Sequence, residues 1–310
     1  MTARDLLANW QALGSRQVPA NGIELRVVEH GEGAPVVFCH GFPELGFSWR
    51  HQVFALADAG FRTLTPDMRG YGGSSRPARV EDYDLLTISA DLVGLLDAAG
   101  LEDAIFVGHD WGASVVWQLA RAYPDRVRAV AGLSVPATPR SSAPPVPILR
   151  KRLGEDFYMV WFQEPGVADP VLDKNVRHTL LQDDVLSARN FLDTDRPEPP
   201  LPAWLSPTEF DYYVQAFTTT GFTGGLNYYR TLDRTWELTA HLADVKITQP
   251  SLFIAGSTDP VIRFTPLAKM PEMLTDLRGS IILEGAGHWI QQQRPAEVNA
   301  ALIDFARAVA

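Results

Sequence analysis

The sequence Gly-His-Asp-Trp-Gly at residues 108–112 has the residue types of a catalytic turn. The apolar run 104–107 before it predicts a strand, and the amphipathic stretch from residue 113 predicts a helix. Small residues around a side chain on a tight strand-to-helix turn are typical of an exposed nucleophile. A carboxylate needs no base to become nucleophilic at pH 7, and its attack on a saturated carbon produces an alkyl ester. The pattern therefore predicts Asp110 as a nucleophile toward carbon.

Hydrolysis of such an ester requires a water molecule activated by a histidine, which a second carboxylate orients. Asp259 follows the apolar run 252–255, and His288 follows the last predicted strand. Taken alone, Asp259 could equally begin a turn and His288 could cap a loop. The chain order nucleophile, acid, base is that of the α/β-hydrolase fold, and it favours a triad of Asp110, Asp259 and His288.

The sequence His-Gly-Phe-Pro-Glu at residues 40–44 directly follows the predicted strand that ends at Cys39. A loop at this position can supply one backbone donor of an oxyanion hole, here the N–H of Phe42, and the N–H of Trp111 would supply the other. The alternative interpretation is an ordinary turn built on Gly and Pro.

The elements that must position these residues follow a pattern of strands alternating with helices. Short apolar runs alternate with amphipathic stretches in the first and last thirds of the chain, which is typical of a mostly parallel sheet flanked by helices. The candidate strands are residues 23–29, 35–39, 62–65, 104–108, 127–133, 250–255 and 280–283.

The middle of the chain differs in character. Prolines gather at residues 144–147 and 197–202, with helical patches and aromatic residues between them. We therefore expect an α/β fold whose core is formed by residues 1–136 and 241–310, with a mostly helical lid inserted at residues 137–240.

Composition and charge exclude several classes of partner. The 310 residues include 46% hydrophobic and 21% charged residues, as in globular proteins. A net charge of −10 opposes binding to nucleic acid or to an anionic membrane surface. No apolar run is long enough for a membrane span or a signal peptide, so a cytoplasmic protein is expected. The single cysteine, Cys39, excludes an intramolecular disulfide and a multi-cysteine metal site. We expect no metal and no cofactor.

Taken together, these motifs resemble those of a known family, the epoxide hydrolases of the α/β-hydrolase superfamily, and they are similar to the hydrolase domain of soluble epoxide hydrolases. The resemblance covers nearly the whole chain. The nucleophile and oxyanion motifs are shared with dehalogenases, whereas the two lid segments, residues 161–168 and 221–230, are more specific to the epoxide hydrolases. The matching residues are 40–44, 48–50, 107–112, 161–168, 221–230 and 287–289.

The resemblance implies that two lid tyrosines, Tyr158 and Tyr229, bind the epoxide oxygen. An opening epoxide leaves as an alkoxide, a far stronger base than tyrosinate, so a phenol with a pKa near 10 can protonate it. We expect Phe42 and Trp111 to line an apolar pocket with the two tyrosines and to contact the substrate. The alternative is that both tyrosines are packed aromatic residues with one polar atom. Tyr228, where tryptophan is usual, and Phe157, in place of an acidic residue, depart from the family pattern and bear on substrate preference.

The expected activity is hydrolysis of a lipophilic epoxide to a vicinal diol, and three other functions are alternatives to it. A haloalkane or haloacetate dehalogenase shares the aspartate nucleophile and a tryptophan at the position of Trp111. It also needs a second side-chain donor to the halide, where this chain has Phe42. A serine esterase is disfavoured because Asp110 stands at the attacking position. A catalytically silent binding protein would not need the triad. The expected partners are a small epoxide and water, and monomer and homodimer both stay open.

Overall fold

A single eight-stranded sheet forms the centre of the computed structural model, which describes residues 3–182, 186–193, 198–265 and 267–310. The strand order is β1-β2-β4-β3-β5-β6-β7-β8. β1 pairs with β2, and β2 with β4, in antiparallel fashion, and all other neighbours are parallel. The strands are β1 (Arg16–Ala20), β2 (Ile23–His30), β3 (Ala34–Cys39), β4 (Phe61–Pro66), β5 (Ala104–His109), β6 (Val127–Leu133), β7 (Ser251–Gly256) and β8 (Leu277–Leu283).

The mostly parallel sheet confirms the predicted fold class. Each of the seven predicted strands is present, with ends that differ by at most a few residues. β1 is not among the predicted strands; it contains Pro19 and buries only Val18 and Ala20. A short, half-polar strand with proline is possible at a sheet edge, where one side of the ladder needs no hydrogen bonds. Its sequence therefore carries little strand signal.

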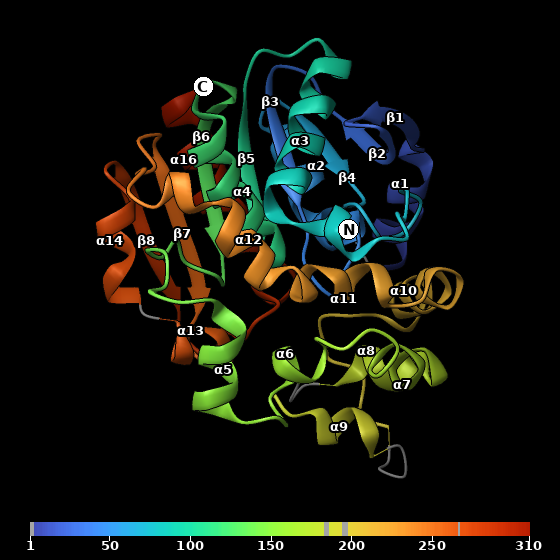
Figure 1. Cartoon of the computed structure of the whole chain (residues 1–310). Coiled ribbons are helices and arrows are strands. Elements are labelled where there is room, and N and C mark those ends of the chain that lie inside the picture. The colour runs from blue at the N-terminus through green and yellow to red at the C-terminus, as the bar shows by residue number, and fades with distance from the viewer. Residues whose placement is uncertain (1–2, 183–185, 194–197, 266) are drawn as a thin grey trace.

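Helices cover the sheet as two layers. α3 packs on α4, and α2 packs on α16; Figure 1 shows α3 and α4 in front of the strands. Strands buried on both faces read as nearly continuous apolar runs, and every residue of β5 and β7 is buried. The helices of the core are α1 (Ala3–Leu13), α2 (Arg50–Asp58), α3 (Leu85–Ala99), α4 (Trp111–Ala122), α13 (Pro260–Phe264), α14 (Met270–Met273), α15 (Ile290–Gln293) and α16 (Pro295–Val309).

The chain between β6 and β7 forms a set of helices, which we call the inserted helices. They gather at one end of the sheet, below the strands in Figure 1. α10, α11 and α12 contact both the core and the other inserted helices. The inserted helices are α5 (Pro145–Leu153), α6 (Tyr158–Trp161), α7 (Asp169–Lys174), α8 (Val176–Leu181), α9 (Ala188–Leu192), α10 (Pro207–Thr220), α11 (Thr223–Arg230) and α12 (Leu232–Leu238).

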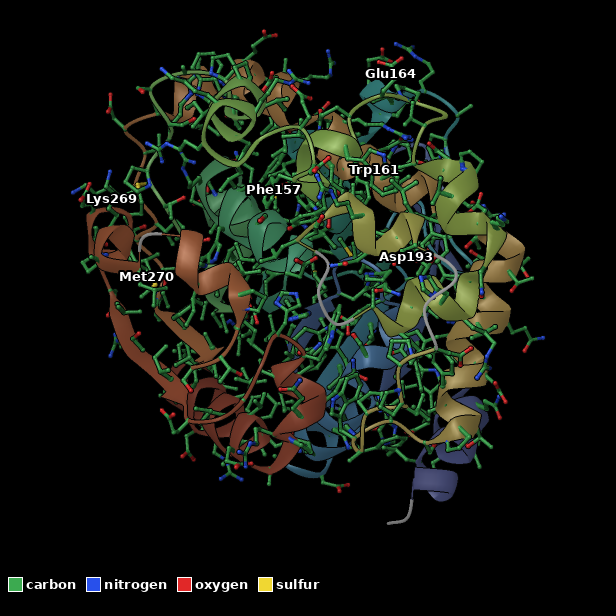
Figure 2. The ribbon with its side chains drawn as sticks, turned by 90° about the horizontal axis from the view of Figure 1, so that it is seen from below. Phe157, Trp161, Glu164, Asp193, Lys269 and Met270 are labelled. Atoms are coloured by element: carbon green, nitrogen blue, oxygen red, sulfur yellow. The ribbon has the colours of Figure 1, made fainter. Side chains whose placement is uncertain are left out.

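Seen from below, Phe157 and Trp161 lie in the upper half of the view, and Lys269 and Met270, at the start of α14, lie at its left edge (Figure 2). Within the described ranges, no helix has both the length and the apolar character needed to cross a membrane.

Candidate active site

Asp110 lies at the turn between β5 and α4, at the end of the sheet that the inserted helices cover. Its backbone has φ 54° and ψ −119°, a conformation that costs energy for a residue with a side chain and that often marks functional sites. The flanking glycines make this turn possible. A Cβ on Gly108 would overlap the carbonyl of Gly112, and a Cβ on Gly112 would overlap the carbonyl of Cys39. The turn therefore holds the Asp110 side chain in one place.

The three residues of the predicted triad meet at this end of the sheet. His288 Nε2 lies 3.5 Å from Asp110 Oδ2. On the other side of the ring, His288 Nδ1 lies 3.1 Å from both carboxylate oxygens of Asp259. Asp259 follows β7 and its Oδ1 also accepts a hydrogen bond from the backbone of Val261, so it caps α13 as well. The two interpretations of Asp259 are thus compatible.

Electrostatics links the three side chains. Burial by itself lowers the pKa of His288, but its hydrogen bonds and its attraction to Asp110 and Asp259 raise that pKa to about 10. Burial raises the pKa of both carboxyl groups, and the nearby His288 more than offsets this, so the pKa of Asp110 and of Asp259 lies below the usual value. At neutral pH the site therefore holds an imidazolium between two carboxylates.

The backbone N–H of Phe42 donates a hydrogen bond of 2.8 Å to Asp110 Oδ1. This leaves Oδ2 as the oxygen that faces His288. Trp111 begins α4 directly after Asp110. Gly41 is required beside them, because a Cβ there would overlap the Asp110 carboxylate. A donor on Oδ1 is suited to stabilising negative charge on that oxygen.

Tyr158 and Tyr229 line the same cavity as Asp110 and His288. Tyr158 begins α6 and Tyr229 lies in α11, and their ring centroids are 5.7 Å apart. Both side chains are buried. Burial and the negative charge of Asp110 raise the pKa of both phenols well above the usual value. Both phenols therefore stay protonated and able to donate over the physiological pH range.

The cavity has a volume of about 230 Å³ and a largely apolar wall. Phe42 belongs to the wall, and its ring packs edge-on against Tyr229 at 5.5 Å. The Trp111 ring packs edge-on against Tyr229 at 4.9 Å and does not belong to the wall. The lining consists of Phe42, Pro43, Asp110, Tyr158, Phe162, Gln182, Leu186, Phe191, Tyr229, Thr258, Pro260, Val261, Gly287, His288, Trp289 and Gln293.

Further residues, which were not among the predicted site residues, hold the backbone of His288. The His288 carbonyl lies 2.8 Å from His109 Nε2 and accepts a hydrogen bond of 2.9 Å from the Ser134 hydroxyl. His109 Nδ1 lies 2.9 Å from the buried Glu44 carboxylate. The only signal in the sequence is their place, since each stands at or just after the end of a strand that leads to the site. Which polar group each one binds is not readable there.

Among the described residues, no group of three or more His, Cys, Asp or Glu side chains is arranged to hold a metal ion. The single cysteine is buried in β3, and burial raises the pKa of its thiol. Cys39 is thus an inert core residue, as its apolar surroundings in the sequence indicate.

Comparison with known proteins gives a consistent result. Residues 34–295 match the family described as alpha/beta hydrolase fold. The chain is 53% identical over 309 residues to epoxide hydrolase A of Mycobacterium tuberculosis (strain ATCC 25618 / H37Rv), an alignment that covers 94% of this chain and 96% of that protein. It is 39% identical over 297 residues to bifunctional epoxide hydrolase 2 of Sus scrofa, covering 92% of this chain and 53% of that longer protein.

The likeness extends to three dimensions. The crystal structure of epoxide hydrolase A from Mycobacterium thermoresistibile superposes with a TM-score of 0.91 at 52% identity, covering 96% of this chain and 99% of that chain. The similarity therefore includes the core and the inserted helices alike.

Proposed function

This chain belongs to the α/β-hydrolase fold family and is an epoxide hydrolase, and on that premise we propose a two-step reaction with Asp110 as its nucleophile. The observation that carries the proposal is one cavity in which His288 lies within reach of two carboxylates and two buried phenols face the same space. The substrate is a small lipophilic epoxide, in keeping with the apolar wall.

In the first step, Asp110 Oδ2 attacks a ring carbon of the epoxide. A carbon–oxygen bond forms to Asp110 as the carbon–oxygen bond of the ring breaks, and the phenols of Tyr158 and Tyr229 bind the leaving oxygen and supply its proton. The product is a hydroxyalkyl ester of Asp110. A halide would leave without a proton, so a pair of protonated phenols suits an epoxide better than a haloalkane.

In the second step, His288 removes a proton from water, and the hydroxide attacks the ester carbon of Asp110. The Phe42 N–H, already on Oδ1, stabilises the oxyanion that forms on that oxygen, with the Trp111 N–H as second donor. Collapse of this intermediate breaks the bond between the Asp110 carboxyl carbon and the alkylated oxygen. The leaving alkoxide takes the hydroxyl proton of the intermediate, which releases the diol and restores the carboxylate. Asp259 keeps the imidazole oriented and stabilises its charged form.

The protons balance over the cycle. Esterification removes the charge of Asp110, which is one of the two carboxylates that raise the pKa of His288. The imidazolium then gives up a proton, which replaces the one that the phenol transfers to the epoxide oxygen. His288 is left neutral and can act as the base toward water, from which it regains its proton. No cofactor or metal is needed.

The inserted helices complete the site. We assign residues 1–136 and 241–310 to a core that supplies the triad, and residues 137–240 to a cap that supplies Tyr158 and Tyr229. The position of these tyrosines over Asp110, on α6 and α11, supports this division.

The test is to trap the ester. In the His288→Gln variant, the first step can proceed once and the second cannot, so intact-protein mass spectrometry after incubation with styrene oxide should show one adduct of the mass of the epoxide. Peptide mapping should place it on Asp110. The Asp110→Ala variant is the control and should show no adduct and no diol formation. An adduct on another residue, or diol formation by Asp110→Ala, would contradict the mechanism.

A further inference from the structure

The two phenols of the site come from helices that are far apart in the sequence and must converge on one oxygen atom. α6, which carries Tyr158, has only four residues, and a helix of one turn has no stability of its own. Tyr229 stands near the end of α11. The spacing between the phenols therefore depends on whatever joins α6 to α11.

Gln163 is the first connection. Its Nε2 amide group donates a hydrogen bond of 2.7 Å to the carbonyl of Met159, in α6, and another of 3.0 Å to the carbonyl of Tyr229. One side chain thus uses both of its N–H groups to tie the backbone beside Tyr158 to the backbone of Tyr229 itself.

Arg230 is the second connection. Its Nε donates a hydrogen bond of 3.0 Å to the carbonyl of Phe162, directly after α6. Its Nη2 lies 2.5 Å from Asp169 Oδ2, and the Arg230 side chain is only 2% exposed. Asp169 is held in turn by the backbone N–H of Gly166 at 2.9 Å and by the hydroxyl of Thr223 at 2.7 Å. This buried ion pair fixes the end of α11 against the segment that follows α6, and the Thr223 hydroxyl fixes its start.

We propose that Gln163, Asp169 and Arg230 form a clamp that sets the spacing of the two phenols and thereby controls the ring-opening step. The inference deepens the proposed function and rests on it. None of the three side chains lines the cavity, so they are positioning residues that act through Tyr158 and Tyr229. Two donors can share one oxygen only if each O–O distance is near 2.7 Å, and a displacement of about 1 Å can cost about a hundredfold in rate.

The Gln163→Met variant keeps the length of the side chain and removes both hydrogen bonds. Single-turnover measurements, with the reaction quenched and the protein weighed by mass spectrometry, give the rate of ester formation and the rate of ester hydrolysis separately. Ester formation should slow by about ten- to a hundredfold, because the phenols lose their relative placement. Ester hydrolysis should keep its wild-type rate, because it uses His288 and water and not the phenols.

Gln249→Met is the matched control. Gln249 also donates from one amide group to two backbone carbonyls, those of Ala120 and Pro124, at 3.2 and 3.0 Å. It precedes β7, at the end of the sheet away from the triad. This variant should lose a similar amount of thermal stability and keep the wild-type rate of both steps.

A second readout separates positioning from general loosening of the fold. In a Tyr158→Phe/Tyr229→Phe background, the Gln163→Met change should have no further effect on ester formation, because the groups through which it acts are gone. An additional loss of the same size in that background would overturn the proposal. So would a wild-type rate of ester formation in Gln163→Met itself.

The failure of the clamp and the failure of the proposed function give different results. If the paired phenylalanine variant forms the ester at the wild-type rate, the phenols are not the acid and the proposed function fails. If that variant is slow and Gln163→Met is normal, only the clamp fails. Should Gln163→Met not fold, Arg230→Lys takes its place, because lysine keeps the charge beside Asp169 without the fork that also reaches Phe162. It should show the same selective loss in ester formation.

Discussion

At the scale of single residues, the two carboxylates around His288 have different fates in the proposed reaction. Asp259 keeps its charge throughout, whereas Asp110 loses its charge when the ester forms. The pKa of His288 is raised to about 10 by both of them, against the effect of burial. The histidine is therefore an imidazolium before the epoxide arrives and becomes a better base once Asp110 has reacted.

This predicts that Asp110→Ala lowers the pKa of His288 below about 10, because the variant removes one of the two negative charges that favour the imidazolium. The sign follows from charge alone, since fewer negative neighbours mean that the ring loses its proton at lower pH. NMR titration of the His288 ring measures the change. Asp97→Ala removes the same charge from a surface pair with Arg126 and should leave the titration unchanged. A His288 pKa that stays near 10 in Asp110→Ala would contradict the assignment.

At the scale of elements, the turn between β5 and α4 holds the Asp110 carboxylate in the place that the proposed reaction requires. The carboxylate is exposed to the cavity because β3, β5 and α4 approach one another so closely that only glycine fits at residues 108 and 112. The positive φ of Asp110 is held by this packing rather than by its own preference. Gly108 and Gly112 are thus structural requirements of the turn that carries Asp110.

The Gly112→Ala variant tests this requirement. The added Cβ would meet the carbonyl carbon and oxygen of Cys39, which are backbone atoms of a buried strand and cannot move aside easily. We expect a loss of stability of about 1–3 kcal/mol from overpacking, together with slower ester formation as Asp110 shifts. Thermal melting and single-turnover rates measure the two effects. Gly279→Ala in β8, where the Cβ would meet only the flexible end of Leu252, should be close to wild type in both.

At the scale of the whole molecule, a buried polar chain joins the inserted helices to the core. Arg50, in α2, places Nε 2.6 Å from Glu209 Oε1 of α10. Its Nη1 donates a hydrogen bond of 2.6 Å to Gln292, which in turn donates to the carboxylate of Glu44 at 2.7 Å. Neither Arg50 nor Glu209 is exposed to solvent. The attachment of α10 therefore relies on a charge pair that has no access to water.

Replacement of Arg50 by Met should destabilise the protein by about 3–5 kcal/mol, because it leaves the Glu209 carboxylate buried without its partner. Urea unfolding at pH 7.5 measures the loss. The loss should shrink at lower pH, since Arg50 helps to keep the pKa of Glu209 below its usual value and an unpaired carboxylate can instead take a proton. The double variant Arg50→Met/Glu209→Leu should recover part of the stability. A double variant no more stable than Arg50→Met would argue against this ion pair as the cause.

The sequence by itself determined seven of the eight strands and the strand-to-helix turn that carries Asp110. Hydrophobic periodicity depends on near neighbours, so β3, β5, β6 and β7 are readable from their apolar runs. The turn at residues 108–112 is likewise local, since its glycines and its aspartate are adjacent. The order of Asp110, Asp259 and His288 along the chain was also readable, because each follows a predicted strand of a parallel sheet.

Only the tertiary structure decided how these residues meet. The contacts of His288 with Asp259 and of its carbonyl with His109 and Ser134 join segments that are distant in the chain. The spacing of Tyr158 and Tyr229 depends in the same way on side chains that bridge two inserted helices. No sequence period records such contacts, because they arise from the packing of separate elements and from the need of each buried polar group for a partner. Residue types indicate which chemistry is possible, whereas the fold sets the distances between the residues.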